Sequence, residues 1–294
     1  MKKEIQNKIT VSVIITTFNR PIFLEKALKS VVNQTYKNIE IIIIDDGSTI
    51  DNYKIVKKFY KEKIRINYLK LKKNSGAPYA RNFGIKVSNG KYICFLDDDD
   101  EWLPEKLQKQ IEKFKNIPEN VALLYTGGYI KNAKGEIIET FRPAREGKVL
   151  KFLLEENFIP FSSVMIKKKC FQNTGMFDTK LYSCQDWDLW IRISSKHYEI
   201  DFVEEYLTTI TKHSLPSIGT SERAITGYLQ FYKKHFFLFI RNGLQNFLFK
   251  KYIELARSFY HKKKTMKMLE CLFYALIADR RAFLKWVRRI RERK

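Results

Sequence analysis

Runs of apolar residues alternate with amphipathic stretches through the first hundred positions of the chain. Val11–Thr16, Ile39–Ile44 and Tyr92–Leu96 are nearly continuous and rich in β-branched residues, which is typical of strands buried on both faces of a sheet. Ile64–Leu71 alternates like a further strand, and the stretches between the runs show helical spacing, as in Ala77–Val87. This order predicts an open, mostly parallel α/β sheet with helices on both faces.

The second half of the chain changes in character. Ile159–Ile166 is predicted to be another strand, and Asp186–Ile193 a helix that begins with acidic residues. After about Ser221 the pattern becomes helical, aromatic-rich and basic, and residues 241–294 contain 16 Lys and Arg against 4 Asp and Glu. We therefore predict two domains, an α/β domain over residues 1–220 and a basic amphipathic helical region over residues 221–294.

Composition limits the class of protein. The chain has 294 residues, 45% of them hydrophobic, and a net charge of +23, which suits polyanions, anionic membranes or phosphate-bearing substrates. The four cysteines form no CxxC pair, which favours a reducing compartment. No targeting or membrane-spanning segment is recognised, so we expect a cytoplasmic protein.

Polar clusters follow three of the predicted strands. Thr16–Phe18, Asp45–Asp46 and Asp97–Asp99 each come directly after an apolar run. Because ligands of open α/β sheets bind outside the carboxyl ends of the strands, these clusters are expected to meet in one crevice.

Each cluster also has an ordinary structural interpretation. Asp97 and Asp99 form an Asp-x-Asp pair that can bind Mg²⁺ or Mn²⁺ through hard oxygen ligands, or can lie in a solvated acidic turn. An EF-hand is excluded because Trp102 and Gln108 stand where its Gly and Glu are needed. Asp45 and Asp46 can equally form a turn closed by glycine, and TTFNRP after the first strand is no dinucleotide-binding fingerprint.

Five segments, in this order, closely resemble the family 2 glycosyltransferases of bacterial type with the GT-A fold. They are VSVIITTFNRPIFLEKALKSVVNQTYKNIEIIIIDDGS, NSGAPYARNFGI, GKYICFLDDDDEWLPEKL, GMFD and QDWDLWIRIS, and the resemblance runs from about Ile9 to Ser217. It implies transfer of a sugar from a nucleotide-diphosphate donor to an acceptor hydroxyl, with inversion at the anomeric carbon and with Mn²⁺ or Mg²⁺ as cofactor.

The resemblance also implies roles for individual residues. Asp186 is the expected catalytic base, and the expected metal ligands are Asp99, Asp97 and His213. Asp46 is expected to accept a hydrogen bond from the base, Asp45 to support the turn, and Arg81 to lie near the diphosphate. The remaining residues expected to bind the nucleotide sugar are Thr16, Phe18, Asn19, Asp97 and Asp98.

Departures from the family pattern and the basic tail refine these expectations. Gln185 and Met176 replace residues common in relatives, and because the expected base Asp186 is kept, activity is still expected. A downstream QxxRW and a membrane span are absent, so a single-sugar transferase is favoured over a processive synthase. A UDP-sugar donor and a glycan or lipid-linked acceptor are expected, with the tail holding the enzyme on the anionic inner face of the membrane. The alternatives are a nucleotidyltransferase on a similar fold, or a basic module for membrane or nucleic acid, although no nucleic-acid-binding motif is present.

Overall fold

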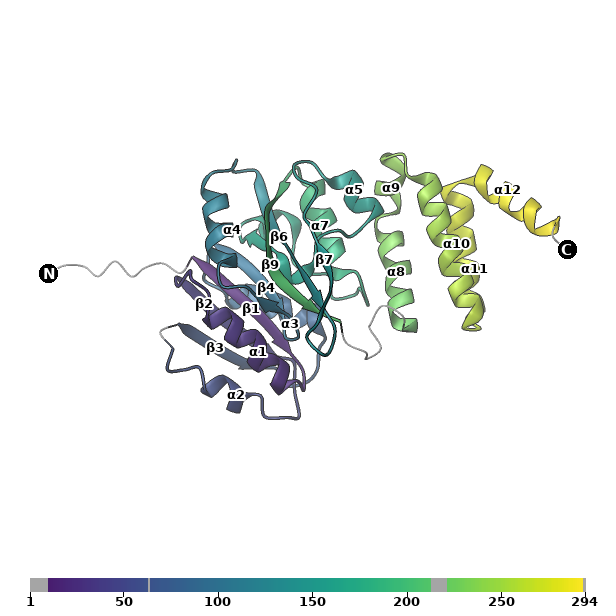
Figure 1. The fold of residues 1–294 in the computed structure, drawn as a ribbon. Coiled ribbons are helices and arrows are strands. Elements are labelled where there is room, and N and C mark those ends of the chain that lie inside the picture. Colours follow the sequence, from purple (N-terminus) through teal and green to yellow (C-terminus); the bar gives the residue numbers. More distant parts are fainter. Residues whose placement is uncertain (1–9, 63, 213–220, 293–294) are drawn as a thin grey trace. The chain divides into compact units, whose positions relative to one another are not determined.

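A computed structural model describes residues 10–62, 64–212 and 221–292, and it divides into two compact units (Figure 1). The first unit takes in the described residues up to Leu153, Asn157–Thr179 and those from Leu189 to the end of the sheet. The second takes in Leu154–Glu156, Lys180–Asp188 and the helices after residue 220. The domain boundary at residue 220 stays a prediction because it falls in a stretch that the structure does not describe.

The first unit is built on one mixed sheet. Within the described residues its strand order is β3-β2-β1-β4-β8-β6-β9-β5, with β7 paired to β6. The first four strands are parallel, while β8 runs antiparallel to both β4 and β6. The strands are β1 (Val11–Thr17), β2 (Ile39–Asp45), β3 (Arg65–Lys70), β4 (Tyr92–Asp97), β5 (Glu101–Trp102), β6 (Val121–Lys131), β7 (Ile137–Phe141), β8 (Met165–Lys167) and β9 (Glu199–Thr211).

Helices cover both faces of this sheet, as the sequence predicts. Val13 and Ile41 belong to a buried cluster that also contains residues of α1, α2 and α4, so these three helices cover one face of the sheet. The other face receives α3, where a Cβ added at Gly84 would come within 2.6 Å of Ile14. Glycine therefore allows this helix to pack closely on β1. The helices of this half are α1 (Pro21–Val32), α2 (Tyr53–Lys57), α3 (Ala77–Val87), α4 (Lys106–Lys115), α5 (Leu150–Glu155), α6 (Cys170–Thr174) and α7 (Gln185–Ser195).

One predicted strand is wrong over most of its length. Only Met165–Lys167, at the end of Ile159–Ile166, is a strand, and Phe161–Ser163 forms the 3-10 helix η1. Pro160 precedes this turn and accepts a hydrogen bond from the Ser163 amide through its carbonyl at 3.1 Å. An apolar run resembles a buried strand, but a local turn has overridden the pattern here. The long strand β9 was not predicted at all.

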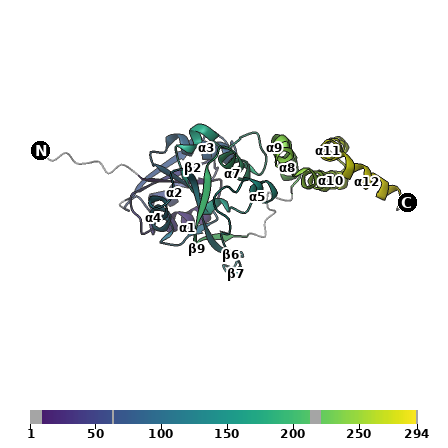
Figure 2. The same ribbon diagram turned by 90° about the horizontal axis from the view of Figure 1, so that it is seen from above.

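The second unit consists mainly of helices around an aromatic core. Trp187 stacks on Phe231 with ring centroids 4.4 Å apart, and Tyr252 stacks on Tyr274 at 5.4 Å. Helices α10 and α11 lie side by side in both views (Figures 1 and 2). Among the described residues, no helix has the length and apolar character needed to span a bilayer. The helices are α8 (Glu222–Lys234), α9 (Phe236–Arg241), α10 (Gln245–His261), α11 (Thr265–Ala278) and α12 (Arg280–Arg291).

Candidate functional site

The ends of three adjacent strands bring the predicted polar clusters to one edge of the sheet. β1 lies between β2 and β4, and the parallel register pairs Thr17 with Asp45 and Thr16 with Asp97. The Asp46 amide donates to the Thr17 carbonyl at 2.9 Å, which continues this alignment past the strand ends. The convergence predicted from the sequence is therefore confirmed.

Asp45 holds the turn after β2 from inside. Its buried carboxylate accepts hydrogen bonds from the Ser48 amide at 2.7 Å, from Asn52 Nδ2 at 3.0 Å and from the Tyr68 hydroxyl. Burial alone would raise the pKa of Asp45, but these donors outweigh it and lower the pKa below its ordinary value. Gly47 follows with φ of 78°, and a Cβ there would meet the Lys73 backbone at 2.5 Å. Asp45 is therefore a support of the turn.

Asp46 faces the segment before α3 instead. Its two carboxylate oxygens accept the amides of Ser75 at 2.7 Å and Gly76 at 2.8 Å. Burial raises the pKa of Asp46, although the two amides oppose the rise. Each carboxylate oxygen has a second lone pair, so Asp46 keeps acceptor capacity for a further donor.

Asn19 fixes the loop that lies beside this turn. Its Oδ1 accepts the amides of Thr49 at 2.8 Å and Ile50 at 3.2 Å, while its own amide donates to Ser48 Oγ at 2.8 Å. Asn19 has φ of 56°, a conformation that asparagine tolerates better than most residues. Its neighbour Phe18 carries an exposed ring, and Thr16 is half-buried.

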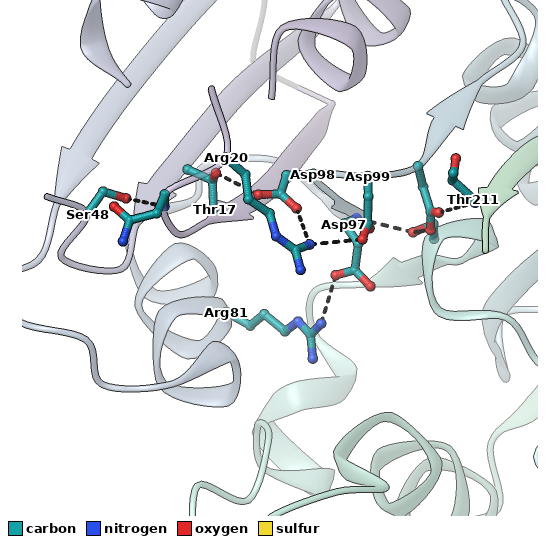
Figure 3. A network of polar contacts seen from close by, with 11 residues as sticks. Thr17, Arg20, Ser48, Arg81, Asp97, Asp98, Asp99 and Thr211 are labelled. Atoms are coloured by element: carbon teal, nitrogen blue, oxygen red, sulfur yellow. Dashed lines mark hydrogen bonds and ion pairs between the residues drawn. The ribbon is translucent and has the colours of Figure 1, made fainter. Parts of the chain in front are cut away.

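The four consecutive aspartates that begin at the last residue of β4 are divided between two environments (Figure 3). Asp97, Asp99 and Asp100 each offer a carboxylate oxygen, and these oxygens lie within 4.8 Å of one another. Asp98 is turned away from them and accepts the Thr17 hydroxyl at 2.6 Å. Burial raises the pKa of Asp98 to about 6, against the opposing effects of Thr17 and the charge of Arg20.

Asp100 belongs to the cluster although the sequence analysis did not select it. Its carboxylate accepts the Ser162 hydroxyl at 2.5 Å and the Thr211 amide at 3.1 Å, and burial raises its pKa well above the ordinary value. Ser162 Oγ also accepts the Asp97 amide at 3.2 Å, so one residue of η1 holds both ends of the acidic turn. No local pattern in the sequence identifies Ser162 as this partner.

The three carboxylates fit a divalent metal ion. Mg²⁺ and Mn²⁺ prefer oxygen ligands, and a small cluster of carboxylate oxygens at a strand end is a suitable donor set. His213, the third ligand expected from the sequence, lies outside the described residues.

Two arginines flank the acidic turn. Arg81 donates from Nη2 to Asp97 Oδ1 at 2.8 Å, and its guanidinium carbon lies 3.9 Å from the centre of the Phe161 ring. Its Nε is buried without a hydrogen-bond partner among the described residues. Arg20, which the sequence analysis did not select, donates from Nη1 to Asp98 Oδ1 at 3.2 Å and to Asp99 Oδ2 at 2.9 Å (Figure 3).

The Gly175–Asp178 turn is anchored to α3. Asn82 accepts the Phe177 amide at 2.9 Å and donates to the Phe177 carbonyl at 2.8 Å. Arg192 donates to the carbonyls of Thr174 and Met176 and so holds the turn from its other side. These bonds explain the presence of Asn82 in the ARN segment.

Asp186 and Asp188 lie in the first turn of α7 and differ in environment. Asp186 is half-buried, whereas Asp188 is fully buried. Asp188 Oδ1 accepts from Lys234 Nζ at 2.8 Å and contacts His235 Nε2 at 2.9 Å, within the second unit. Asp188 is therefore held by structural partners.

Comparison with known proteins identifies the family to which this chain belongs. The model of glycosyl transferase family 2 matches residues 12–174, more than half of the chain and all three strand ends described above. The chain belongs to this family. It is therefore a glycosyltransferase, and a structural comparison agrees with the GT-A fold predicted from the sequence.

Two curated relatives illustrate the range of similarity of this glycosyltransferase. An uncharacterized glycosyltransferase of Methanocaldococcus jannaschii is 32% identical over 215 residues, which cover 72% of each chain. The putative colanic acid biosynthesis glycosyl transferase WcaA of Escherichia coli is 31% identical over 242 residues, covering 78% of this chain and 82% of WcaA. The match spans only 28% to 32% of three longer Rickettsia glycosyltransferases.

Two solved structures share the fold at low sequence identity. Staphylococcus aureus TarS 1-349 in complex with UDP-GlcNAc has a TM-score of 0.61 at 16% identity, covering 91% of this chain and 72% of that one. The mannosyltransferase PcManGT of Pyrobaculum calidifontis, in complex with GDP-Man and Mn²⁺, has a TM-score of 0.61 at 14% identity, covering 92% and 75%.

Proposed function

We propose that this glycosyltransferase moves a single sugar from a nucleotide-diphosphate sugar, with UDP favoured, to a hydroxyl of a glycan or lipid-linked precursor, with inversion. The observation that carries the proposal is the group formed by Asp97, Asp99 and Asp100 at the edge of the sheet where Asp46 also lies. A carboxylate cluster at the carboxyl ends of parallel strands, where open α/β sheets bind ligands, suits a donor whose diphosphate is bound together with a divalent cation.

The roles proposed for the donor side follow from these contacts. Asp46 would accept the imide N–H of the base, and the exposed Phe18 ring would stack on it. Asp97, Asp99 and Asp100 would hold Mn²⁺ or Mg²⁺, which when bound neutralises charge on the leaving diphosphate. The buried Arg81 Nε, which has no partner among the described residues, would donate to a phosphate oxygen. Asp98 and Asn19 would act by shaping the pocket.

On the acceptor side of the reaction, the proposed catalytic base is Asp186. A single displacement with inversion needs one carboxylate to take the acceptor proton and needs no covalent nucleophile. Asp186 is the half-buried acid of the family motif, while Asp188 is occupied by Lys234 and His235. The names of relatives such as WcaA support a surface polysaccharide precursor as acceptor.

The test is a profile of donor hydrolysis and donor binding across UDP-, GDP- and CMP-sugars. We expect hydrolysis of one UDP-sugar that requires Mn²⁺ or Mg²⁺ and disappears with a chelator. Asp100→Asn should raise the Mn²⁺ concentration needed for half-maximal hydrolysis, while Glu119→Gln, which changes an exposed acid on the same unit, should leave it unchanged. Full hydrolysis in the chelator would contradict the metal-dependent proposal, and a preference for a GDP-sugar would contradict the proposed base.

We also propose that the second unit holds the enzyme on an anionic membrane surface. Helix α11 buries its small residues, Cys271, Ala275 and Ala278. Its large apolar residues are exposed at intervals of three and four, and together they define the α11 stripe: Met266, Leu269, Phe273, Leu276 and Ile277. Leu272, between two members of this stripe, is half-buried.

Basic residues follow this stripe along the chain. On α12, Arg281, Lys285, Arg288 and Arg289 are exposed, and Asp279 caps the helix by accepting the Ala282 amide at 2.9 Å. Exposed apolar residues combined with lysine and arginine are typical of helices that lie in the membrane interface. Each basic residue near anionic lipid contributes about 1 kcal/mol, so several together suffice for peripheral attachment.

Vesicle sedimentation tests this attachment. The protein should bind phosphatidylglycerol vesicles more strongly than phosphatidylcholine vesicles, and Leu269→Glu with Phe273→Glu should abolish binding. The matched control is Ile137→Glu with Ile138→Glu, because these residues are 56% and 52% exposed, close to the 58% of Phe273 and the 50% of Leu269, but lie on β7. Unchanged binding by the double variant would contradict the proposal. A wild-type dimer that the double variant converts to monomers would assign the stripe to self-association instead.

A further inference from the structure

Arg20 places a positive charge beside two of the four adjacent carboxylates, those of Asp98 and Asp99. Its Nη1 is shared between Asp98 and Asp99, at 3.2 Å and 2.9 Å. Asp98 is held on its other oxygen by the Thr17 hydroxyl, so the Arg20 guanidinium is the charged partner of this buried acid. Four adjacent carboxylates repel one another, and a neighbouring guanidinium reduces that repulsion.

The two arginines beside the acidic turn differ in their freedom to move. The side chain of Arg81 is 11% exposed, contacts the Phe161 ring at 3.9 Å and is therefore fixed in place. The side chain of Arg20 is 43% exposed, and its guanidinium lies 5.9 Å from the Phe23 ring, too far for tight stacking. Arg20 is thus the one that can exchange partners without disturbing buried packing.

We propose that Arg20 is an internal counter-ion that makes binding of a divalent cation at Asp97, Asp99 and Asp100 depend on the donor's diphosphate. Without a nucleotide, the guanidinium neutralises Asp99 and repels an arriving cation. When a diphosphate is present, its oxygens offer Arg20 a second partner, and Asp99 becomes available to the metal. This inference rests on the proposed function of the site and concerns the order in which its ligands bind.

The test is calorimetric titration of Mn²⁺ into the protein with and without saturating UDP. Arg20→Gln removes the charge and keeps a hydrogen-bond donor. We expect this variant to bind Mn²⁺ alone about tenfold more tightly than wild type, equivalent to about 1.4 kcal/mol, because the repulsion is gone. By linkage, the factor by which UDP improves Mn²⁺ binding should fall in the same variant.

Arg65→Gln is the matched control. Arg65 is exposed and begins β3, at the ends of the parallel strands opposite to the site. Its substitution makes the same change in net charge without touching the acidic turn. It should bind Mn²⁺ as wild type does. Equally tighter Mn²⁺ binding in both variants would attribute the effect to net charge and overturn the inference. Unchanged Mn²⁺ affinity in Arg20→Gln would also overturn the inference. If UDP still improved Mn²⁺ binding to the wild-type protein, the proposed function would stand in either case. Wild-type protein in which Mn²⁺ and UDP bind independently would overturn both.

A second measurement uses the unmodified protein, in case Arg20→Gln does not fold. The side-chain Nε–H signal of Arg20, assigned by its loss in Arg20→Lys, should shift in NMR spectra when Mg²⁺ and UDP are added together. Mg²⁺ alone at the same concentration should leave it in place. A signal that ignores the two ligands together would overturn the inference, because the guanidinium would then have kept its partners.

Discussion

Asparagine substitutions at Asp186 and Asp188 should separate catalysis from stability on one helical turn. Both changes remove one negative charge and preserve shape. Asp188 is fully buried with Lys234 and His235 as partners, whereas Asp186 is half-buried. Asp188→Asn should therefore act on folding, and Asp186→Asn on the transfer reaction.

The magnitude for Asp188→Asn follows from its partners. Removing one member of a buried ion pair costs about 3–5 kcal/mol. Two features reduce this figure here: the Lys234 side chain is 30% exposed and can return to water, and asparagine keeps an oxygen that can accept from His235. We expect a loss of about 2–3 kcal/mol in unfolding free energy, since a kept hydrogen bond contributes about 1 kcal/mol.

For Asp186→Asn the expected loss is in rate. Removing a general base lowers turnover by about 10²–10⁴-fold with little effect on donor affinity. The unfolding free energy should fall by less than in Asp188→Asn, because Asp186 is half-buried and Asp188 is fully buried.

Two assays on the same preparations decide the matter. Urea unfolding followed by circular dichroism gives the stability change, and transfer to acceptor at saturating donor gives the rate. The reasoning is refuted if Asp188→Asn is as stable as wild type and loses more activity than Asp186→Asn. That result would move the catalytic base two residues along α7.

Three further outcomes are expected. Asp99→Ala should abolish Mn²⁺-dependent UDP binding, measured by calorimetry, without lowering the melting temperature, because the carboxylate lies at a strand end. Burial lowers the pKa of Lys106 to about 8, whereas an unfolded lysine has a pKa of about 10.4. Between these two pH values only the unfolded chain carries this proton, so the unfolding free energy should rise with pH. Lys106→Met should accordingly be more stable at pH 7 by up to about 3 kcal/mol in urea unfolding, with the gain shrinking over that range. Gly84→Ala should lower the melting temperature, since its Cβ would press on Ile14.

The sequence was sufficient to predict which chain segments reach the site. Apolar runs fix the buried strands, and parallel pairing then brings their ends to one edge, so the sequence alone places Thr17, Asp45 and Asp97 together. The fold of the first hundred residues follows from the same pattern, as do the helices of the second unit.

The different environments of the four aspartates in Asp97–Asp100 could not be predicted in this way. It depends on how the turn after β4 twists and on partners far away in the chain, such as Ser162 and Thr211. Residue type alone does not distinguish a carboxylate that accepts a buried hydroxyl from one that faces an open edge. The 3-10 turn that supplies Ser162 was itself mistaken for a strand, because an apolar run of this length is compatible with both.

The position of Arg81 has a consequence for how specificity in this protein can change. The side chain joins three segments, since it pairs with Asp97 and lies against the rings of Phe161 and Phe177. The Phe177 backbone is in turn fastened to Asn82, the next residue along α3. Substitutions in the Gly175–Asp178 turn are therefore expected to shift the Arg81 guanidinium as well, next to the proposed site of the donor's phosphates. We therefore expect a library that varies this turn alone to change donor binding through Arg81 as well.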